Sequence, residues 1–277
     1  MEVIRAVTAR IKAIALDCGA SACGITAAGD LAEFERFAAA AASAPAGLAY
    51  LGREPLKRKN IKNWFPPAVS VLVCAFRYWD PGRDHAVELA KAGDPAAFLS
   101  ASGRKKHQPE LLAAPGAKIS RYALGRDYHL WVKERLSSAL AAVKKEFPGA
   151  EGKIFCDTSP VLEKELARLA GLGFRGRNTL ILSPELGSYF FLGGIALDFE
   201  LEQDAPSAAS CGPCDLCVKA CPTGALKGGA LDAGLCLSYW TTQAKEKIPE
   251  PLARAGGGWA YGCDICQEAC PYNGKTR

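Results

Sequence analysis

The chain has 277 residues, of which 49% are hydrophobic and 23% are charged, and its net charge is +5. This composition is typical of a globular protein and excludes a largely disordered one. Charges throughout the first twenty residues exclude a secretory signal, and no stretch approaches the ~20 apolar residues that span a bilayer. We therefore expect a cytoplasmic protein with no membrane partner, in which clustered cysteines bind metal rather than form disulfides.

The first part of the chain alternates between helical and strand-like patterns. The spacing of apolar residues predicts helices over residues 5–16 and 31–41, with a short strand over 22–28 between them. The continuously apolar run VSVLVCAF at 69–76 predicts a buried strand. Residues 81–117 combine helix-forming residues with several turn signals, which favours an insertion or a lid.

A second alternation of helices and strands follows. Residues 127–147 have the strongest amphipathic pattern in the chain and predict a long helix. A further helix is expected over 160–171, with Ser159 as its cap and Pro160 at its first position. Strands are expected over residues 153–155, 178–182 and 189–201. This pattern predicts an α/β domain over residues 1–203.

The composition changes after Gln203, where DAPSAAS is typical of a linker and beyond which eight of the twelve cysteines lie. Residues 204–277 contain the run CGPCDLCVKACP, the single Cys236 and the second run CDICQEACP. In bacterial ferredoxins, three thiolates at this spacing bind one 4Fe-4S cluster, and the fourth binds the neighbouring cluster. We therefore expect a ferredoxin-like module with two clusters.

The same pairing logic assigns each cysteine of the module to a cluster. One cluster takes Cys211, Cys214, Cys217 and Cys270, and the other takes Cys221, Cys236, Cys263 and Cys266. Structural zinc sites also use paired C-x2-C motifs. The third cysteine of the first run and the repeated Cys-Pro ending favour iron-sulfur clusters over zinc.

Clusters pass electrons but do no substrate chemistry, so the first domain must supply the acceptor. No G-x-G-x-x-G run opens a βαβ unit and no Walker A run is present, so neither a dinucleotide nor ATP is indicated. Two polar segments stand out instead, KISRYALGRDYH at 118–129 and CDTSPVLEKELARLAGLGFRGRNT at 156–179. Together with the cysteine runs and CLSYWTT, they resemble the cobalamin-dependent epoxyqueuosine reductases, from about residue 48 onward.

This family removes the epoxide oxygen of epoxyqueuosine at the wobble position of tRNA. The resemblance implies an α/β cobalamin-binding domain fused to the double-cluster module. It also implies a cytoplasmic enzyme, expected to be a monomer, that takes electrons from a donor such as a flavodoxin or ferredoxin. By the same resemblance the catalytic acid is Asp157. The residues that it places near cobalamin are Arg121, Tyr122, Asp127, His129, Lys164, Asn178, Thr179 and Ser238.

Elementary chemistry supports an acid at Asp157, because loss of the epoxide oxygen as water requires a proton donor. A carboxyl can serve if burial raises its pKa, whereas a following helix N-terminus would lower it, so the role requires a dry pocket. Alternatively, Asp157 only caps a helix. Similarly, His129 has a purely structural alternative, and Lys164 has a solvated one.

The segment REPLKRKNIK at 53–62 holds five basic residues against one acid. Such patches are often only solvated surface, but they also attract phosphate backbones. With the resemblance, we expect tRNA contacts, the anticodon arm included, from this segment and from Lys245. The contact residues are Arg53, Lys57, Arg58, Lys59, Lys62 and Lys245, with Tyr50 and Trp64 as nearby aromatic surface.

Some features depart from the family. Phe174 and Arg177 in GFRGRN replace a tryptophan and a lysine, and the sequence stops soon after the last cysteine, where many members carry a helical extension that holds tRNA. Two alternatives therefore stay open. One is a corrinoid reductase of a small molecule, related to reductive dehalogenases, and the other is a double-cluster electron carrier without enzymatic activity. Binding of cobalamin would exclude the carrier.

Overall fold

The computed structural model describes residues 2–79, 114–124 and 127–274. Its centre is an antiparallel four-stranded sheet in the order β1-β2-β7-β4. The strands are β1 (Ala22–Ala27), β2 (Ser70–Arg77), β7 (Phe190–Leu197) and β4 (Gly152–Phe155). The predicted insertion over 81–117 lies outside the described residues apart from its last four.

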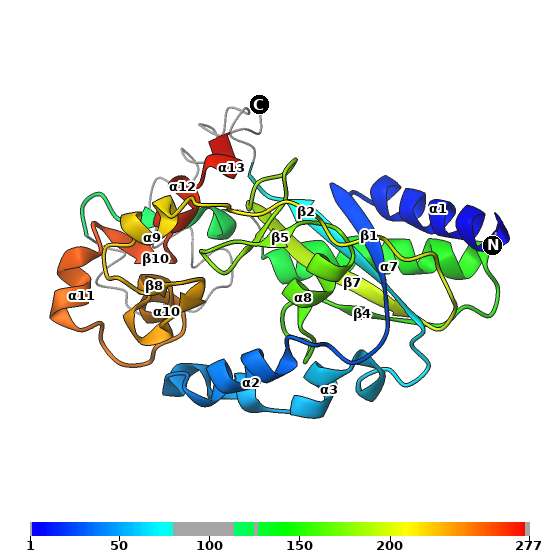
Figure 1. Ribbon diagram of the computed structural model, residues 1–277, viewed down its shortest axis with the longest axis horizontal. Helices are drawn as coiled ribbons and strands as arrows, with labels where there is room; N and C mark the ends of the chain where they lie inside the picture. Colours follow the sequence, from blue (N-terminus) through cyan, green and yellow to red (C-terminus); the bar gives the residue numbers. More distant parts are fainter. Residues whose placement is uncertain (1, 80–113, 125–126, 275–277) are drawn as a thin grey trace.

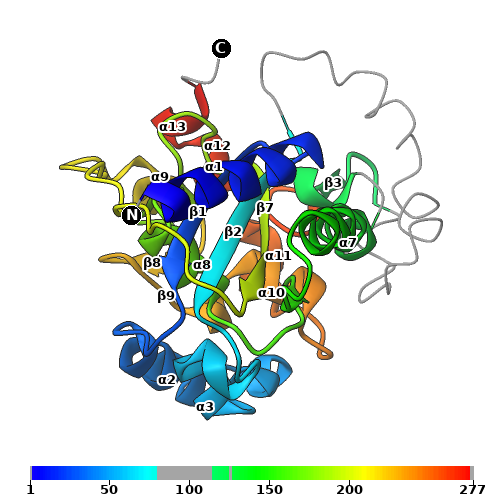
Figure 2. The same cartoon turned by 90° about the vertical axis from the view of Figure 1, so that its right-hand side faces the viewer.

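Both faces of this sheet are covered, which explains why the strands lack polar alternation. Leu72 and Cys74 of β2 face the core that contains α1 (Glu2–Asp17) and α7 (Tyr128–Glu146). The intervening Val73 faces a second core that contains α8 (Glu163–Leu169). Figure 2 shows α7 end-on beside β2 and β7. The predicted α/β class is confirmed.

A small helical lobe lies beside the sheet and is seen below it in Figure 1. It contains α2 (Phe34–Ala42), η1 (Ala46–Gly52), α3 (Pro55–Lys59) and η2 (Ile61–Asn63). The lobe touches the cysteine-rich module at Gly47, where an added Cβ would lie 2.9 Å from the Gln243 carbonyl oxygen and 3.0 Å from the Tyr239 hydroxyl. A side chain at position 47 would therefore push the two parts of the molecule apart.

The cysteine-rich part contains only short elements. These are α9 (Leu216–Ala220), β8 (Leu226–Lys227), β9 (Ala230–Leu231), η4 (Ala233–Leu235), α10 (Leu237–Thr242), α11 (Glu250–Ala255), β10 (Trp259–Tyr261), α12 (Ile265–Glu268) and α13 (Pro271–Gly274). Strand β10 pairs in parallel with β3 (Lys118–Ile119), which is followed by η3 (Arg121–Ala123). Backbone hydrogen bonds thus join this part to the front of the chain.

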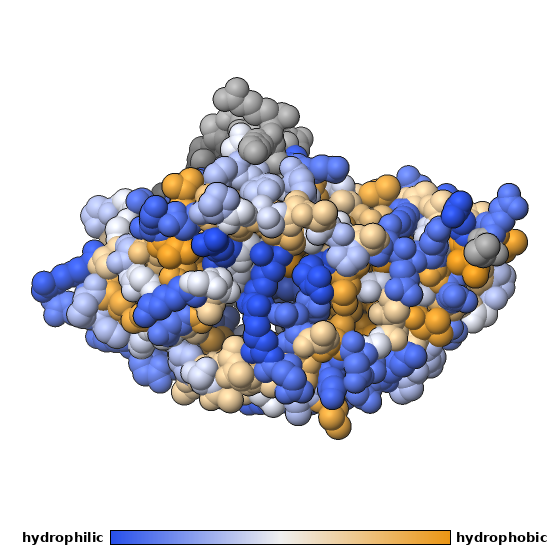
Figure 3. Space-filling view, in the orientation of Figure 1, coloured by the Kyte–Doolittle hydropathy of each residue, from blue (hydrophilic) through white to orange (hydrophobic). Residues whose placement is uncertain are grey.

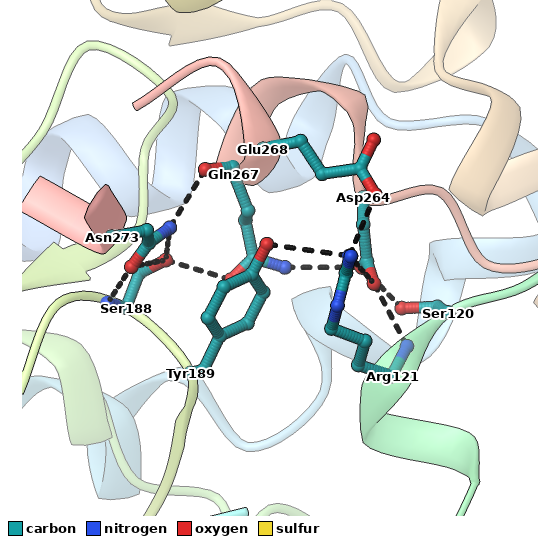
Figure 4. A network of polar contacts seen from close by, with 8 residues as sticks. All are labelled: Ser120, Arg121, Ser188, Tyr189, Asp264, Gln267, Glu268 and Asn273. Carbon is teal, nitrogen blue, oxygen red and sulfur yellow. Dashed lines mark hydrogen bonds and ion pairs between the residues drawn. The ribbon is translucent and has the colours of Figure 1, made fainter. Parts of the chain in front are cut away.

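A buried polar network strengthens the same junction (Figure 4). The side chain of Asp264 is fully buried and accepts hydrogen bonds from the Ser120 hydroxyl and, at 2.8 Å, from the Arg121 backbone N–H. The Arg121 guanidinium reaches Asp264 at 3.3 Å and Glu268 at 2.7 Å. On the other side, Ser188 donates to Gln267 and Asn273. The network fixes how the two parts dock.

Most predicted elements are present, but two predictions were wrong. Helix α8 begins at Glu163 rather than Pro160, with Leu162 as its N-cap. The Ser159 carbonyl instead accepts the Val161 N–H in a tight turn. The strand expected over 178–182 is only β6 (Ile181–Leu182), which pairs with an unpredicted β5 (Phe174–Arg175). No helix within the described ranges is both long and apolar enough to cross a membrane.

Candidate active site and cluster sites

Three predicted residues meet where α7 begins and β4 ends. Asp127 caps α7, because its Oδ1 accepts the backbone N–H of His129 at 2.9 Å. The same oxygen lies 2.8 Å from His129 Nδ1, and His129 Nε2 lies 2.9 Å from Asp157 Oδ2. The imidazole is therefore held between two carboxylates that are thirty residues apart in the chain.

The charges of this triad follow from its geometry. The hydrogen bond to Asp157 raises the pKa of His129, and the bond to Asp127 adds to it against the effect of burial. Burial opposes ionisation of Asp157, yet the hydrogen bond and charge of His129 prevail and lower the pKa of Asp157. Both shifts thus favour the imidazolium form of His129 and the carboxylate form of Asp157, and 54% of the Asp157 side chain remains exposed. The dry pocket that an acid role requires is not formed by the described residues alone.

The loop that carries Asp157 has an uncommon backbone conformation and is held by a residue that sequence reasoning missed. Asp157 has φ +53°, a left-handed conformation that few non-glycine residues adopt, although aspartate adopts it more readily than most. Its backbone N–H donates to a carboxyl oxygen of Glu163, the first residue of α8. Burial raises the pKa of Glu163 to about 8, so this carboxyl is mostly neutral at pH 7. The motif PVLEKEL contains no signal for such a role other than its acidic first turn.

Tyr128 is a second missed neighbour of Asp157. Burial raises the pKa of the Tyr128 phenol, and the adjacent Asp157 carboxylate, to which it is hydrogen-bonded, raises it further. The ring stacks on His129, with centroids 4.0 Å apart, and on Phe191 of β7, with centroids 4.4 Å apart. Tyr128 therefore orients both the imidazole and the carboxylate from one rigid aromatic stack.

Lys164 connects the Asp157 region to the cysteines. Part of the residue is exposed at the surface, but its Nζ makes a part-buried hydrogen bond to the Thr179 carbonyl oxygen at 3.2 Å. Burial lowers the pKa of Lys164, while Cys266, Glu163 and Asp157 act in the opposite direction. The Lys164 amine thus interacts electrostatically with both a predicted cluster ligand, Cys266, and the predicted acid, Asp157. Figure 3 shows a hollow near the middle of the molecule, with strongly hydrophilic side chains at its mouth.

Part of the basic segment faces this same region. Burial raises the pKa of Tyr50, and the Asp157 carboxylate adds to the shift. Arg58 interacts electrostatically with Tyr50 and Glu163, although burial lowers its pKa. Trp64 is not an exposed surface for a base, because Lys153 lies over its ring at 4.2 Å.

The remaining basic residues of the segment and Lys245 differ in their surroundings. Lys57 pairs with Glu54, and Lys59 lies 3.9 Å from Asp30. Exposed basic side chains are found at Arg53, Lys62 and Lys245. A phosphate backbone would therefore meet a mixture of paired and exposed cations.

Four of the cysteines line one cavity of about 210 Å³. They are Cys211, Cys214, Cys217 and Cys270, the set expected for the first cluster. The other four interact electrostatically, with Cys263 near Cys221 and Cys236, and Cys266 near Cys263. Within the described ranges, no three His, Cys, Asp or Glu side chains converge on a single-ion site. Thiols that surround a cavity fit a bulky cluster better than one zinc ion.

The other residues that the resemblance placed near cobalamin lie in different surroundings rather than around one pocket. Arg121 belongs to the junction described above, and Tyr122 packs between the rings of Tyr128 and Tyr261. Asn178 lines the cavity of the first four cysteines. The carbonyl of Thr179 accepts the Lys164 hydrogen bond, and Ser238 lies on α10.

The two family departures also lie beside this cavity. Phe174 is buried and contacts the ring of Tyr272 edge-on, with centroids 5.2 Å apart. The Arg177 guanidinium donates to the Gly212 carbonyl at 3.0 Å, inside the first cysteine run. Both substitutions therefore act where the front domain meets the cysteine loop.

Two family models match the chain. One, described as epoxyqueuosine reductase QueG, matches residues 58–158, and a 4Fe-4S double cluster binding domain matches residues 210–273. An epoxyqueuosine reductase of Synechocystis sp. is 35% identical over 219 residues, which cover 78% of this chain and 67% of the relative. An epoxyqueuosine reductase of Leadbetterella byssophila is 40% identical over 168 residues, which cover 61% of this chain and 56% of that relative. The chain thus spans little more than half the length of some curated relatives.

Solved structures agree with these matches. An epoxyqueuosine reductase with an epoxyqueuosine-modified tRNA-Tyr stem loop has a TM-score of 0.77 and 27% identity, covering 98% of this chain and 66% of that one. A Bacillus subtilis epoxyqueuosine reductase, solved with its catalytic aspartate loop swung out of the active site, has a TM-score of 0.78, 26% identity and the same coverage. A reductive dehalogenase at 17% identity and a TM-score of 0.53 shares the fold alone.

Proposed function

Because the chain belongs to the epoxyqueuosine reductase family, we propose that it reduces epoxyqueuosine to queuosine in tRNA with two 4Fe-4S clusters and cobalamin. One observation carries the proposal: Lys164 interacts with both Asp157 and Cys266. The proposed proton source and a predicted cluster ligand therefore both act on the same amine. An electron carrier would need only the source of electrons, so the presence of a proposed proton source favours an enzyme.

The overall reaction sets what the residues must supply. Conversion of an epoxide to an alkene consumes two electrons and two protons and releases the oxygen as water. The clusters deliver electrons singly, so two transfers are needed for each turnover. The protons must come from groups that reach the departing oxygen.

The Asp157 triad is suited to deliver a proton. His129 Nε2 lies within hydrogen-bond distance of Asp157 Oδ2, and Asp127 fixes the imidazole from Nδ1, so a protonated imidazole would present its Nε2 proton to Asp157. A proton that passes from Asp157 to the substrate oxygen can be replaced at once from His129. Exclusion of water from the exposed Asp157 carboxyl, once the hollow is filled, shifts its pKa upward, toward the range in which it donates.

Residues near Asp157 fit the needs of a cobalamin. The Lys164 amine could donate to amide or phosphate oxygens, and the Tyr50 ring, which is 42% exposed, could supply an apolar surface. When bound, cobalamin would supply a strongly reducing cobalt centre for the electrons that the clusters deliver. Within this scheme, Lys164 would help to hold the cofactor, and Ser238 on α10 would contribute from the cysteine-rich part.

The basic lobe is the part of the chain that we assign to tRNA. Arg58 and Tyr50 lie near Asp157, so a nucleotide extruded into the hollow would leave its phosphates beside Arg53 and Lys62. Lys245 follows α10 in the cysteine-rich part and is exposed. A cytoplasmic location, a monomeric state and a flavodoxin- or ferredoxin-like donor complete the proposal.

Mass spectrometry of tRNA nucleosides tests the substrate directly. The gene is expressed in a bacterial strain that lacks its own reductase and therefore accumulates epoxyqueuosine. We expect queuosine to appear, whereas the empty plasmid and the Asp157→Asn variant leave the epoxide in place. Unchanged epoxyqueuosine, with soluble and cluster-loaded protein present, would remove the tRNA substrate from the proposal.

A further inference from the structure

The turn over residues 176–180 belongs to the front domain but lies against the first cysteine run. Arg177 binds the Gly212 carbonyl, and the Gly176 N–H donates to the Leu180 carbonyl at 2.8 Å, which closes the turn. Thr179 has φ +66°, a conformation that β-branched residues rarely adopt. Such a conformation persists only where the surrounding structure fixes it. The turn therefore holds its side chains in a defined arrangement at the cavity.

Asn178 is the member of this turn that lines the cavity. Its side chain is buried, with 4% exposure, and shares the cavity wall with the four cysteines. Among the described residues, its Nδ2 has no hydrogen-bond partner. Its Oδ1 accepts the Leu180 backbone N–H at 3.3 Å, so the amide cannot be reversed without setting donor against donor. The Asn178 Nδ2–H group is therefore available to donate a hydrogen bond to a group bound in the cavity.

We propose that the Asn178 amide donates an N–H···S hydrogen bond to the 4Fe-4S cluster held by this cavity and thereby raises its reduction potential. The thiolates in question are those of Cys211, Cys214, Cys217 and Cys270. Reduction adds negative charge to a cluster, so a donor on its sulfur atoms stabilises the reduced form. The inference rests on the cluster part of the proposed function and is independent of the tRNA substrate.

This assignment gives the front domain a part in electron transfer. The cysteines come from the C-terminal module, whereas Asn178 comes from the turn between β5 and β6. The potential of the first cluster then depends on how the two parts dock. The resemblance alone had implied that Asn178 contacts cobalamin. In this assignment its amide instead binds the first cluster.

Potentiometric titration of anaerobically purified protein, followed by electron paramagnetic resonance, measures the effect. In Asn178→Leu, we expect the ratio of reduced to oxidised first cluster at the wild-type midpoint to fall about tenfold, equivalent to about 59 mV for one electron. The second cluster, in the same molecule, should keep its potential. The control Leu182→Ala removes an apolar side chain from the same cavity wall and should not lower the potential.

A second measurement uses the unaltered protein. Pulsed electron paramagnetic resonance of the reduced cluster in ¹⁵N-asparagine-labelled protein should show a nitrogen coupling that Asn178→Leu lacks. If Asn178→Leu fails to bind the cluster, this coupling alone decides the matter. A loaded cluster with an unshifted potential, or wild-type protein without the coupling, would overturn the assignment. Protein that contains no iron would instead overturn the cluster proposal itself.

Discussion

The cysteine-rich part and the Asp157 region hold their chemical groups by opposite means. In the former, ligands lie on short helices and turns with few buried large side chains, so bound clusters must supply much of its stability. In the latter, His129 lies on α7 and Asp157 lies on the loop directly after β4, and both elements pack in the core of the sheet. The first site should collapse when a ligand is lost, whereas the second should lose chemistry but keep its fold.

Removal of a cluster ligand should have the largest effect. Cys270→Ala should lose the first cluster and so about half of the bound iron, together with all reductase activity. The matched control is Cys74→Ala, since Cys74 is also buried but lies in β2. It should keep its iron and lose only about 1–2 kcal/mol of stability. Iron analysis and thermal unfolding distinguish the two, and equal iron contents would contradict the contrast.

Loss of the proposed acid comes next. Asp157→Asn should lower turnover by about 10²–10⁴-fold, because an amide does not donate a carboxyl proton. Cobalamin binding and thermal stability should be retained, since the side chain lies outside the core. The control Asp232→Asn changes a carboxylate whose oxygen only caps the Gly234 N–H. Turnover by Asp157→Asn equal to that of the control would exclude the proton-donor role.

Substitutions at the buried network that joins the front domain to the cysteine-rich part should have an intermediate effect, on stability. Arg121→Met leaves the fully buried Asp264 carboxylate without its guanidinium, which we expect to cost about 3–5 kcal/mol. Arg10→Ala breaks an ion pair with Glu146 in which both side chains are exposed, and it should cost at most about 1 kcal/mol. Thermal unfolding of cluster-loaded protein compares the two variants. Similar losses would show that the junction does not couple the parts.

Glu163 tests whether the loop must be held in place. Glu163→Gln keeps an oxygen that can accept the Asp157 N–H, so activity at pH 7 should be nearly unchanged. Glu163→Ala removes it and should lower turnover by up to about 10²-fold. Because the pKa of Glu163 is about 8, only the wild type gains a second carboxylate beside Asp157 as the pH rises through 8. The ratio of Glu163→Gln to wild-type activity should therefore change near that pH, and a constant ratio would contradict the assignment.

Surface cations should give the smallest effects. Arg53→Ala and Lys62→Ala should each weaken tRNA binding and reduce the magnitude of its salt dependence by about one unit of slope. Arg5→Ala is the control, because Arg5 pairs with Glu202 and lies on α1, which is well apart from the helical lobe in Figures 1 and 2. Binding measured at several salt concentrations gives the slopes. Identical slopes for all three variants would exclude the lobe from the tRNA contact.

The sequence predicted the two sites to different extents. Cysteine spacing predicted which four cysteines would lie together, and these four line one cavity. The contact between His129 and Asp157 depends on the sheet and was not predicted, because the family resemblance implied only that both residues belong to one site. The Ser159-Pro160 start signal failed because Asp157 adopts a left-handed conformation and Glu163 holds the loop. Nothing in the pattern around Asn178 indicated a place at the cavity.

The cavity of the first four cysteines has a consequence for when a cluster can be assembled. Cys211, Cys214 and Cys217 lie close together in the sequence, whereas Cys270 lies near the end of the cysteine-rich part. A cage that needs all four thiolates cannot close on a nascent chain that is still short of Cys270. A cluster in this cavity would therefore be completed only after synthesis of nearly the whole described chain.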